Sequence, residues 1–455
     1  MMSLAEAARV LDARLAGADA RFTGVSTDSR TLRPGELFVA LRGERFDGHA
    51  FLDAAAKSGA AGAMVDHGFK GLASIPFIAV PDTLRALGDL ARHWRARFAP
   101  ALVAVTGSNG KTTVKEMLAS ILRAHAGAER VLATAGNLNN EIGLPLTLLR
   151  LRAAHSHCAI ELGMNHRGEI AYLADIARPT VALVNNAQRE HLEFMGSVEE
   201  VAAENASVYG ALPAEGVAVV NADDPHAGFF RDRAAARRIV DFGLETGAAV
   251  TGKAIAGPFS SEIRISLPCG EVQAKLVIPG RHNAMNALAA AACALAAGVP
   301  AEAIGAGLAA FRPYAGRLQV SRLPSGATLI DDSYNANPDS VRAATDVLAA
   351  AGGATLLVLG DMGEVGDQGP DFHLEAGRYA AERGIGALYA IGELTAHTVA
   401  GFGRGARHFA SLEELITAVR AHAGSGETLL VKGSRFMRME RVVEHLLAEE
   451  AAQCC

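Results

Sequence analysis

From residue 101 onward, short apolar runs alternate along the chain with longer stretches of helical periodicity. ALVAVTG (101–107), HCAIELG (157–163) and TVALVNN (180–186) are such runs, and a helix-like segment follows each of them. Strands that are apolar throughout are typical of a parallel sheet buried on both faces. The pattern therefore predicts an α/β domain. The period-two segment SSEIRISLP (260–268) adds a smaller antiparallel part.

The alternation begins again in the last third of the chain, where ATLIDDS (327–333) and ATLLVLGD (354–361) are predicted strands with helices between them. This repetition predicts a second doubly wound α/β unit. The first hundred residues instead mix shorter strands and helices. We therefore predict three domains: a smaller α/β domain at 1–100, a central parallel-sheet domain at 101–313, and a Rossmann-like α/β domain at 314–455.

Composition and charge narrow the range of partners. The 455 residues carry a formal charge of -6, so there is no electrostatic reason to expect nucleic acid or an anionic membrane as partner. No apolar run approaches the length of a membrane span, and the first residues lack the features of a signal peptide. The five cysteines form no CxxC pair, which argues against a disulfide framework or a zinc site. We expect a cytoplasmic, monomeric protein without membrane insertion.

The Gly-rich turn TGSNGKTT, between a predicted strand and a predicted helix, carries the strongest chemical signal. Backbone N–H groups of such a turn approach phosphate oxygens closely, a Lys reaches the outer phosphates, and a Thr holds Mg²⁺. Gly107, Gly110, Lys111 and Thr112 fit this arrangement, although Val105 stands where the standard motif has its first Gly. We therefore predict a phosphate-binding loop in a shortened form.

Polar residues follow the next predicted strands, at the sheet edge where ligands of open α/β sheets bind. Glu161 ends one strand, His191 lies just beyond the next, and Asp223 and Asp224 follow a third. A carboxylate and an imidazole beside a phosphate loop could hold Mg²⁺, although His is an unusual ligand for this ion. Taken alone, His191 is an ordinary loop histidine, and the two aspartates are turn residues before Pro225.

Two further polar clusters lie towards the end of the central domain and beyond it. Asn283 and Asn286 share one face of a predicted helix, where Asn283 suits the N-cap and Asn286, a poor helix former, favours a ligand contact. Arg317 lies at the predicted domain junction. The loop IDDSYNANPDS (330–340) is equally compatible with an Asx turn leading to Pro338 and with a ligand site.

Eight motifs occur in the order that they have in Mur ligases, and together they resemble this family over nearly the whole chain. They are TGSNGKTT, ELGMNHRGEI, NN…EHLE…GS, GRHNAMNALAA, GRLQ, DDSYNANPDS, LGDMGEVG and KGSRFMRME. The N-terminal STDSRTLRPGELFVALRGERFDGHAF resembles the uridine-nucleotide domain of some members. The resemblance implies an ATP-dependent amide ligase of peptidoglycan synthesis, with roles in cell shape and division. The motifs look most like those of members that add D-alanyl-D-alanine to UDP-N-acetylmuramoyl-tripeptide through an acyl phosphate.

The resemblance also implies roles for individual residues. Those implied to act in catalysis are Lys111, Arg317 and His191. Those implied to bind ATP are Gly107, Ser108, Asn109, Gly110, Lys111, Thr112, Thr113, Asn286, Arg317, Asp332, Asn335 and Asn337. Those implied to hold Mg²⁺ are Thr112, Glu161 and His191. Those implied to bind the UDP-linked substrate or the amino substrate are Ser29, Arg30, Asp47, Gly48, His49, Lys432, Ser434 and Arg435.

One position departs from the family pattern. In this family, a Lys in the helix after the GS motif is commonly carbamylated and helps to hold a second Mg²⁺. Asn205 occupies that position here, and its neutral amide cannot form a carbamate. Asn205 is either a neutral oxygen ligand or a hydrogen-bond partner, or else the second metal is held otherwise. We expect an activity that is insensitive to bicarbonate.

Three alternative functions remain. A ligase of the same family that adds the third amino acid is the nearest, but the DNPR stretch typical of its diaminopimelate-adding members is absent. Folylpolyglutamate synthase resembles the chain in its phosphate loop but lacks the N-terminal domain. From another class, the chain could be an ATP-binding regulatory protein without catalysis, although it retains Lys111, Glu161, His191 and Arg317.

Overall fold

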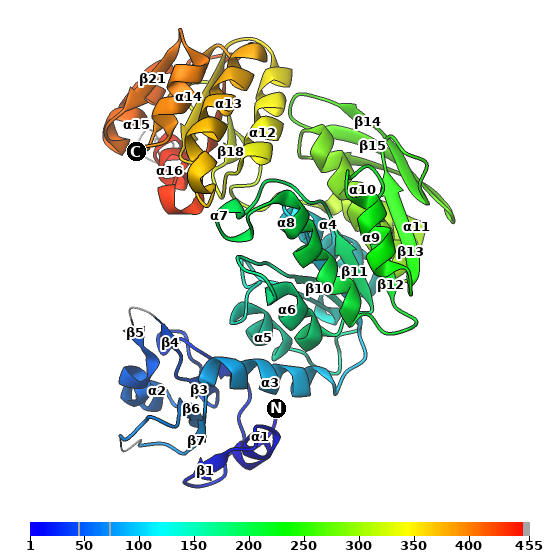
Figure 1. Ribbon diagram of the computed structural model, residues 1–455, viewed down its shortest axis with the longest axis vertical. Helices are drawn as coiled ribbons and strands as arrows, with labels where there is room; N and C mark the ends of the chain where they lie inside the picture. Colours follow the sequence, from blue (N-terminus) through cyan, green and yellow to red (C-terminus); the bar gives the residue numbers. More distant parts are fainter. Residues whose placement is uncertain (44–45, 72–73, 449–455) are drawn as a thin grey trace.

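The computed structural model describes residues 1–43, 46–71 and 74–448. Its strands form three main sheets in three consecutive parts of the chain. Figure 1 shows the first part (blue) at one end of the long axis and the third part (yellow to red) at the other, with the central part between them. Among the described residues, no helix is both long and apolar enough to cross a membrane.

The first part contains a five-stranded sheet in the order β1-β7-β6-β3-β2, in which only β1 is antiparallel to its neighbour. Its strands are β1 (Arg14–Ala16), β2 (Val25–Ser26), β3 (Leu37–Val39), β6 (Gly62–Asp66) and β7 (Phe77–Val80), with a ribbon of β4 (Arg42–Gly43) and β5 (Phe46–Asp47). Its helices are α1 (Leu4–Val10), α2 (Leu52–Lys57) and α3 (Thr83–Arg95). Helix α3 begins where the Asp82 side chain accepts hydrogen bonds from two backbone N–H groups, which is an N-cap.

The central part contains a nine-stranded sheet in the order β16-β15-β14-β13-β12-β11-β8-β10-β9. Its strands are β8 (Ala101–Thr106), β9 (Val131–Ala133), β10 (His157–Glu161), β11 (Val181–Val184), β12 (Val217–Asn221), β13 (Arg238–Gly243), β14 (Val250–Ala256), β15 (Ser261–Leu267) and β16 (Gly270–Leu276). Strands β8 to β14 pair in parallel, whereas β15 and β16 are antiparallel and β15 alternates buried and exposed residues. The antiparallel part predicted from period two is thus confirmed.

Helices cover both faces of the central sheet, which explains why its strands are apolar throughout. Val103 and Val105 of β8 belong to the core formed with α4 (Lys111–Ala126), α10 (Arg281–Ala296) and α11 (Ala301–Ala310). Leu102 and Ala104 belong to the core on the opposite face, formed with α3, α5 (Gly143–Leu148), α6 (Glu169–Ala177) and α8 (Val198–Ala206). The remaining helices of this part are α7 (Leu192–Met195) and α9 (Ala227–Ala234).

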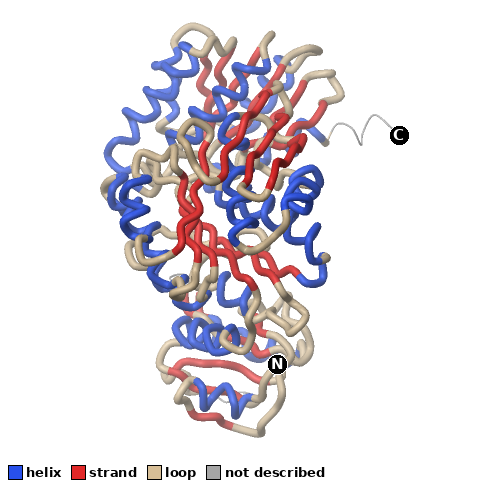
Figure 2. Tube along the Cα trace, turned by 90° about the vertical axis from the view of Figure 1, so that its right-hand side faces the viewer, coloured by secondary structure: helices blue, strands red, loops and turns tan. Residues whose placement is uncertain are grey.

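The third part contains a six-stranded sheet in the order β17-β18-β22-β19-β20-β21, in which only β17 is antiparallel. Its strands are β17 (Gln319–Arg322), β18 (Thr328–Asp332), β19 (Thr355–Gly360), β20 (Ala387–Ile391), β21 (Ala406–Phe409) and β22 (Thr428–Lys432). Its helices are α12 (Pro338–Ala351), α13 (Gly369–Glu382), α14 (Thr395–Phe402), α15 (Leu412–His422) and α16 (Glu440–Leu447). Figure 2 shows helices flanking the strands, as the α/β prediction requires.

The strand order of the central sheet positions the site. From β8, the chain passes first to the edge strand β9 and then to β10 on one side, and only later to β11 on the other side. The carboxyl end of β8 is therefore a topological switch point, where the loops after neighbouring strands diverge and leave a crevice. The loops after β8, β10 and β11 meet at this edge.

Candidate active site

The Gly-rich loop (residues 107–113) follows β8 and includes the first three residues of α4, and its glycines have backbone angles that other residues rarely adopt. Gly107 and Gly110 have φ angles of 126° and 84°, which side chains rarely tolerate. A Cβ atom on Gly110 would lie 2.4 Å from Asn286 Oδ1. Helix α4 starts at Lys111 without a side-chain N-cap, so the N–H groups of its first turn point out of the helix without that partner. Such an end suits an anion.

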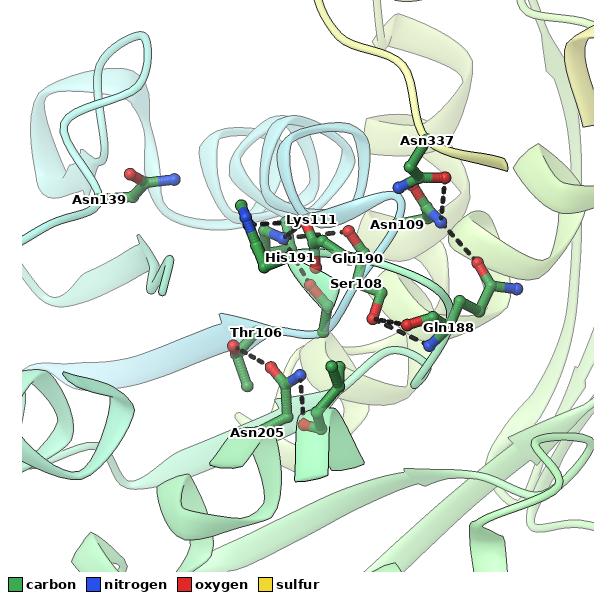
Figure 3. Close-up of polar contacts among 12 residues, drawn as sticks. Thr106, Ser108, Asn109, Lys111, Asn139, Gln188, Glu190, His191, Asn205 and Asn337 are labelled. Carbon is green, nitrogen blue, oxygen red and sulfur yellow. Dashed lines mark hydrogen bonds and ion pairs between the residues drawn. The ribbon is translucent and has the colours of Figure 1, made fainter. Parts of the chain in front are cut away.

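Lys111 has three contacts in this structure, which Figure 3 shows in part. Its Nζ donates to the carbonyl oxygens of Gly107 (2.6 Å) and Ser108 (3.0 Å) and to Glu190 Oε1 (3.0 Å). Glu190 is buried, and its second carboxylate oxygen has no hydrogen-bond partner among the described residues. Burial raises the pKa of Glu190, but Lys111 and His191 outweigh it, so that the pKa is lowered. The lysine therefore already has an anionic partner.

Glu161 ends β10 beside Thr112, as the sequence predicts. Thr112 Oγ1 donates to Glu161 Oε1 at 3.4 Å, and Asn139 Nδ2 donates to the same oxygen at 2.8 Å. Glu161 is 2 % exposed, and its Oε2 has no partner in the part of the chain that the structure describes. A buried, unpartnered carboxylate oxygen next to a hydroxyl fits a hard divalent cation such as Mg²⁺.

His191 lies beside Lys111 but between two carboxylates. Its Nε2 is 3.4 Å from Glu190 Oε1, and its Nδ1 is 2.5 Å from Glu364 Oε2 of the third domain. Burial lowers the pKa of His191, but the two carboxylates outweigh it and raise the pKa to about 9. A protonated imidazole has no lone pair for a metal. Within residues 1–43, 46–71 and 74–448, no group of three or more His, Cys, Asp or Glu is arranged to hold a metal ion. The metal role of His191 stays a prediction.

Asn205 is buried and engaged in hydrogen bonds on both sides of its amide (Figure 3). Thr106 Oγ1 donates to its Oδ1 at 2.7 Å, and its Nδ2 donates to the Val201 carbonyl at 3.0 Å. The sequence left open whether Asn205 is a metal ligand or a hydrogen-bond partner. In this structure it is a hydrogen-bond partner, and it connects α8 to β8.

A cavity of about 810 Å³ lies between the central and third domains, a size that suits a nucleotide-sized ligand. The predicted site residues that line it are Asn109, Gly110, Thr113, Asn286, Arg317, Asp332 and Lys432. The Arg317 guanidinium lies over the Tyr334 ring, 4.2 Å from its centroid, and its Nε is buried without a partner among the described residues. Asp332 pairs with Lys432 at 2.5 Å. The third domain thus contributes charged groups to a cavity that the Gly-rich loop of the central domain borders.

Asparagine side chains connect the Gly-rich loop and the residues around it. Asn337 is the N-cap of α12, and its Nδ2 donates to Asn109 Oδ1 at 2.9 Å across the domain boundary. Asn286 accepts from Asn185 Nδ2 at 3.0 Å. The N-cap predicted for Asn283 is wrong, because Gly280, with a φ of 99°, precedes the helix, and Asn283 donates to the Pro279 carbonyl from inside the first turn.

The first-domain residues do not line this cavity. Gly48 is buried, and a Cβ there would lie 2.6 Å from the Leu41 carbonyl oxygen. Asp47 accepts from the backbone N–H of His49, whose Nε2 accepts from the Asp66 N–H at 3.1 Å. Arg30 is exposed and pairs with Asp28 at 2.7 Å, which lowers the pKa of Asp28 to about 2. Ser29, half-buried, lies between these two.

Four predicted residues of the third domain lie outside the cavity lining: Asn337, described above, and Asn335, Ser434 and Arg435. Ser434 Oγ donates to the Ala336 carbonyl at 3.0 Å, and the Asn335 carbonyl accepts from Lys432 Nζ at 2.9 Å. Arg435 is exposed and pairs with Glu440 at 3.1 Å. Of these, only Arg435 presents its charge to solvent.

Sequence reasoning missed Glu190, Arg189 and Asn139. Glu190 stands directly before His191 in the EHLE motif, so a search for the partner of Lys111 among nearby charged residues could have found it. Asn139 lies in an irregular loop before α5, where no periodicity marks it. Arg189 acts through contacts with a distant part of the chain.

Comparisons with known proteins agree with this geometry. Three family models match the chain in order: "Mur ligase family, catalytic domain" at residues 21–95, "Mur ligase middle domain" at 105–294, and "Mur ligase, glutamate ligase domain" at 316–435. A UDP-N-acetylmuramoyl-tripeptide–D-alanyl-D-alanine ligase of Escherichia coli (strain K12) is 40% identical over 98% of both chains.

Solved structures are similar over the same length. A crystal structure of MurF from Acinetobacter baumannii has a TM-score of 0.91 at 34% identity and covers 98% of this chain and 99% of that chain. The structure of MurF ligase from Thermotoga maritima in complex with ADP has a TM-score of 0.82 at 27% identity, covering 94% of this chain and 98% of that chain. The chain therefore belongs to the Mur ligase family.

Proposed function

We propose that this chain is an ATP-dependent ligase that joins D-alanyl-D-alanine to UDP-N-acetylmuramoyl-tripeptide in the synthesis of peptidoglycan precursors. The relative from Escherichia coli, which carries this activity in its name, supports the proposal by its 40% identity over 98% of both chains. The comparisons give no support to the alternatives, addition of the third amino acid or a non-catalytic regulatory role.

One observation carries the proposal: the Gly-rich loop, which also holds Lys111, borders through Asn109, Gly110 and Thr113 an interdomain cavity that Arg317 lines from the other side. A triphosphate in the cavity would have its outer phosphates between Lys111 and Arg317. The uncapped start of α4 adds the positive end of a helix dipole. Such positively charged surroundings stabilise the charge that develops during phosphoryl transfer.

The chemistry follows from the weakness of a carboxylate as an electrophile. An oxygen of the tripeptide carboxylate attacks the γ-phosphorus of ATP, ADP leaves, and an acyl phosphate forms. The amine of D-alanyl-D-alanine then attacks the acyl carbon, inorganic phosphate leaves with the C–O electron pair, and the new amide loses a proton. Lys111 and Arg317 bind and orient the transferring group, and docking of the third domain excludes water from the acyl phosphate.

Thr112 and Glu161 are the residues that fit Mg²⁺, which would neutralise phosphate charge, and His191 would join them only as a neutral imidazole. Asn286, Asp332, Asn335 and Asn337 are proposed to surround the adenosine, because three of them line or border the cavity.

The outer domains are proposed to hold the other two substrates. We place the UDP group on residues 1–100, where Ser29, Arg30 and Asp47 remain accessible. We place D-alanyl-D-alanine on residues 314–455, where the exposed Arg435 can pair with its carboxylate. The protein is proposed to act as a monomer in the cytoplasm, where ATP is supplied, and its mass in solution tests the first of these points.

Phosphate release and hydroxylamine trapping test the proposed reaction. We expect phosphate release from ATP and UDP-N-acetylmuramoyl-tripeptide to require D-alanyl-D-alanine. Hydroxylamine, supplied in its place, should yield a hydroxamate of the tripeptide. If phosphate release instead requires a single amino acid and the UDP-linked dipeptide, the protein adds the third amino acid of the peptide. If no hydroxamate forms, the two-step scheme is refuted.

A further inference from the structure

Lys111 has no unused proton in this structure. Its three N–H groups match its three contacts, with the carbonyl oxygens of Gly107 and Ser108 and with Glu190 Oε1. A phosphate oxygen can therefore bind Nζ only by replacing one of them. Glu190 supplies the only charged partner of the three and is the nearest chemical equivalent of a phosphate oxygen.

Glu190 belongs to the Gln188–Glu193 segment, which follows β11, includes the first two residues of α7 and has the Gly-rich loop on one side. Gln188 N donates to Ser108 Oγ at 2.9 Å, and Asn109 Nδ2 donates to Gln188 Oε1 at 2.6 Å. Gln188 and Glu190, two residues apart, thus both contact the Gly-rich loop. Figure 3 shows both side chains beside this loop.

The residues between them contact the third domain instead. Arg189 Nη2 is 2.7 Å from Asp339 Oδ1, and its Nη1 is 2.8 Å from Glu375 Oε2. The Arg189 backbone N–H also donates to Asp339 Oδ2 at 2.9 Å. His191 adds its contact with Glu364. The segment therefore alternates along its length between contacts with the Gly-rich loop and contacts with the third domain.

Arg189 holds this boundary with paired charges. Its guanidinium bonds two carboxylates from α12 and α13 at once and lies over the Phe372 ring, 5.2 Å from its centroid. Bidentate arginine–carboxylate pairs are among the strongest and most directional side-chain contacts. Arg189 is not among the described residues that line the cavity. Any effect of Arg189 on a ligand there must pass through its neighbours.

We propose that Glu190 occupies on Lys111 the place of a phosphate oxygen, and that Arg189 is a positioning residue that holds Glu190 there while docking the third domain. Nucleotide binding then requires Glu190 to leave Lys111, and the Gln188–Glu193 segment transmits this exchange to the domain boundary. The inference rests on the proposed function only in taking a triphosphate as the ligand of the Gly-rich loop.

If Glu190 competes with a phosphate oxygen for Lys111, removing its charge should increase the affinity for nucleotide. We would titrate a non-hydrolysable ATP analogue into the full chain by calorimetry, without peptide substrates. Glu190→Gln should bind it about five- to tenfold more tightly than the unaltered protein, because the competing carboxylate is gone and more of the protein is binding-competent. In the Lys111→Ala background, the same change should have no effect. Glu190→Asp, which keeps the charge, should bind within twofold of the unaltered protein.

The outcomes separate the two proposals. If the unaltered chain does not bind the analogue, the proposed function fails. If it binds, but Glu190→Gln binds equally or more weakly while Glu190→Asp remains folded and unchanged, the inference alone is refuted.

The positioning role of Arg189 has its own readout. Arg189→Ala should enlarge the radius of gyration of the nucleotide-free protein in X-ray scattering and tighten analogue binding about threefold. In the Glu190→Gln background it should add nothing to affinity, because Arg189 acts through Glu190. Arg342→Ala is the matched control, since Arg342 also bonds Glu375, at 3.2 Å, but within the third domain. Equal affinity gains by Arg189→Ala in both backgrounds, or none, would refute the role.

Discussion

The edge of the central sheet around Lys111 and the predicted substrate residues of the first domain differ in how their polar groups are satisfied. At the central edge, Glu161 Oε2 and Glu190 Oε2 are buried without a partner among the described residues. In the first domain, the buried His49 side chain has hydrogen-bonding partners for its ring, and the exposed Asp47 accepts from the backbone. An unpartnered buried polar group costs about 1–3 kcal/mol, a cost that a ligand paired with these two groups would remove. Satisfied groups stabilise the fold itself.

Of the substitutions at the edge of the central sheet, Lys111→Ala should lower the activity most. The change removes the cation that orients the transferring phosphate, so we expect the rate of phosphate release to fall about 10³-fold. Lys57→Ala, on the exposed side of the first domain, is the control and should retain full activity. A Lys111→Ala rate within tenfold of the unaltered enzyme would contradict the role of the loop.

Glu161→Gln should have the next largest effect. The substitution keeps the size of the side chain but removes the charge that fits Mg²⁺, so we expect about 10²-fold lower activity and a higher Mg²⁺ concentration for half-maximal rate. Activity measured over a Mg²⁺ titration checks this. An unchanged titration midpoint would show that the unpartnered oxygen of Glu161 serves another purpose.

Acid should destabilise the cavity wall through His282. Burial lowers the pKa of this residue to about 4. The pKa of His282 in the unfolded chain is near 6.5, so between pH 6.5 and 4 the unfolded chain binds more protons than the folded protein. The contribution of neutral His282 to the free energy of unfolding is therefore complete above pH 6.5 and is lost as the pH falls to 4. The loss is at most about 3 kcal/mol. Thermal unfolding across this range should show a smaller decline for His282→Gln, and parallel curves would contradict the assignment.

Gly48→Ala tests the first domain, where we expect a loss of stability with little change in the central site. The added Cβ would lie 2.6 Å from a backbone oxygen, which should destabilise the protein by about 2 kcal/mol. ATP affinity, measured below the unfolding temperature, should stay unchanged. A normal melting temperature together with weaker binding of the UDP-linked substrate would instead make this position part of a binding site.

Added bicarbonate should have the smallest effect, which is none. Asn205 cannot form a carbamate, and both ends of its amide are already hydrogen-bonded. Rates measured in degassed buffer and with bicarbonate should agree. Stimulation by bicarbonate would mean that a lysine elsewhere completes the metal site.

Local pattern was enough for most elements of the fold. The apolar run 101–107 became β8 because a strand buried on both faces needs no polar side, and the alternation at 260–268 became the antiparallel β15. Asn283 was misjudged because a helix start depends on backbone angles, and Gly280 adopts them without a side chain. The Gly-rich loop was predictable because its chemistry lies in neighbouring residues.

By itself, the sequence determined the alternation of strands and helices, the Gly-rich loop and the short motifs to which the site residues belong. All of these depend on residues that are close together in the chain. Only the tertiary structure decided which groups meet. Glu190 reaches Lys111 across 79 positions, and Arg189 reaches Asp339 across 150. Such contacts depend on the packing of whole sheets and helices, and no local period encodes them.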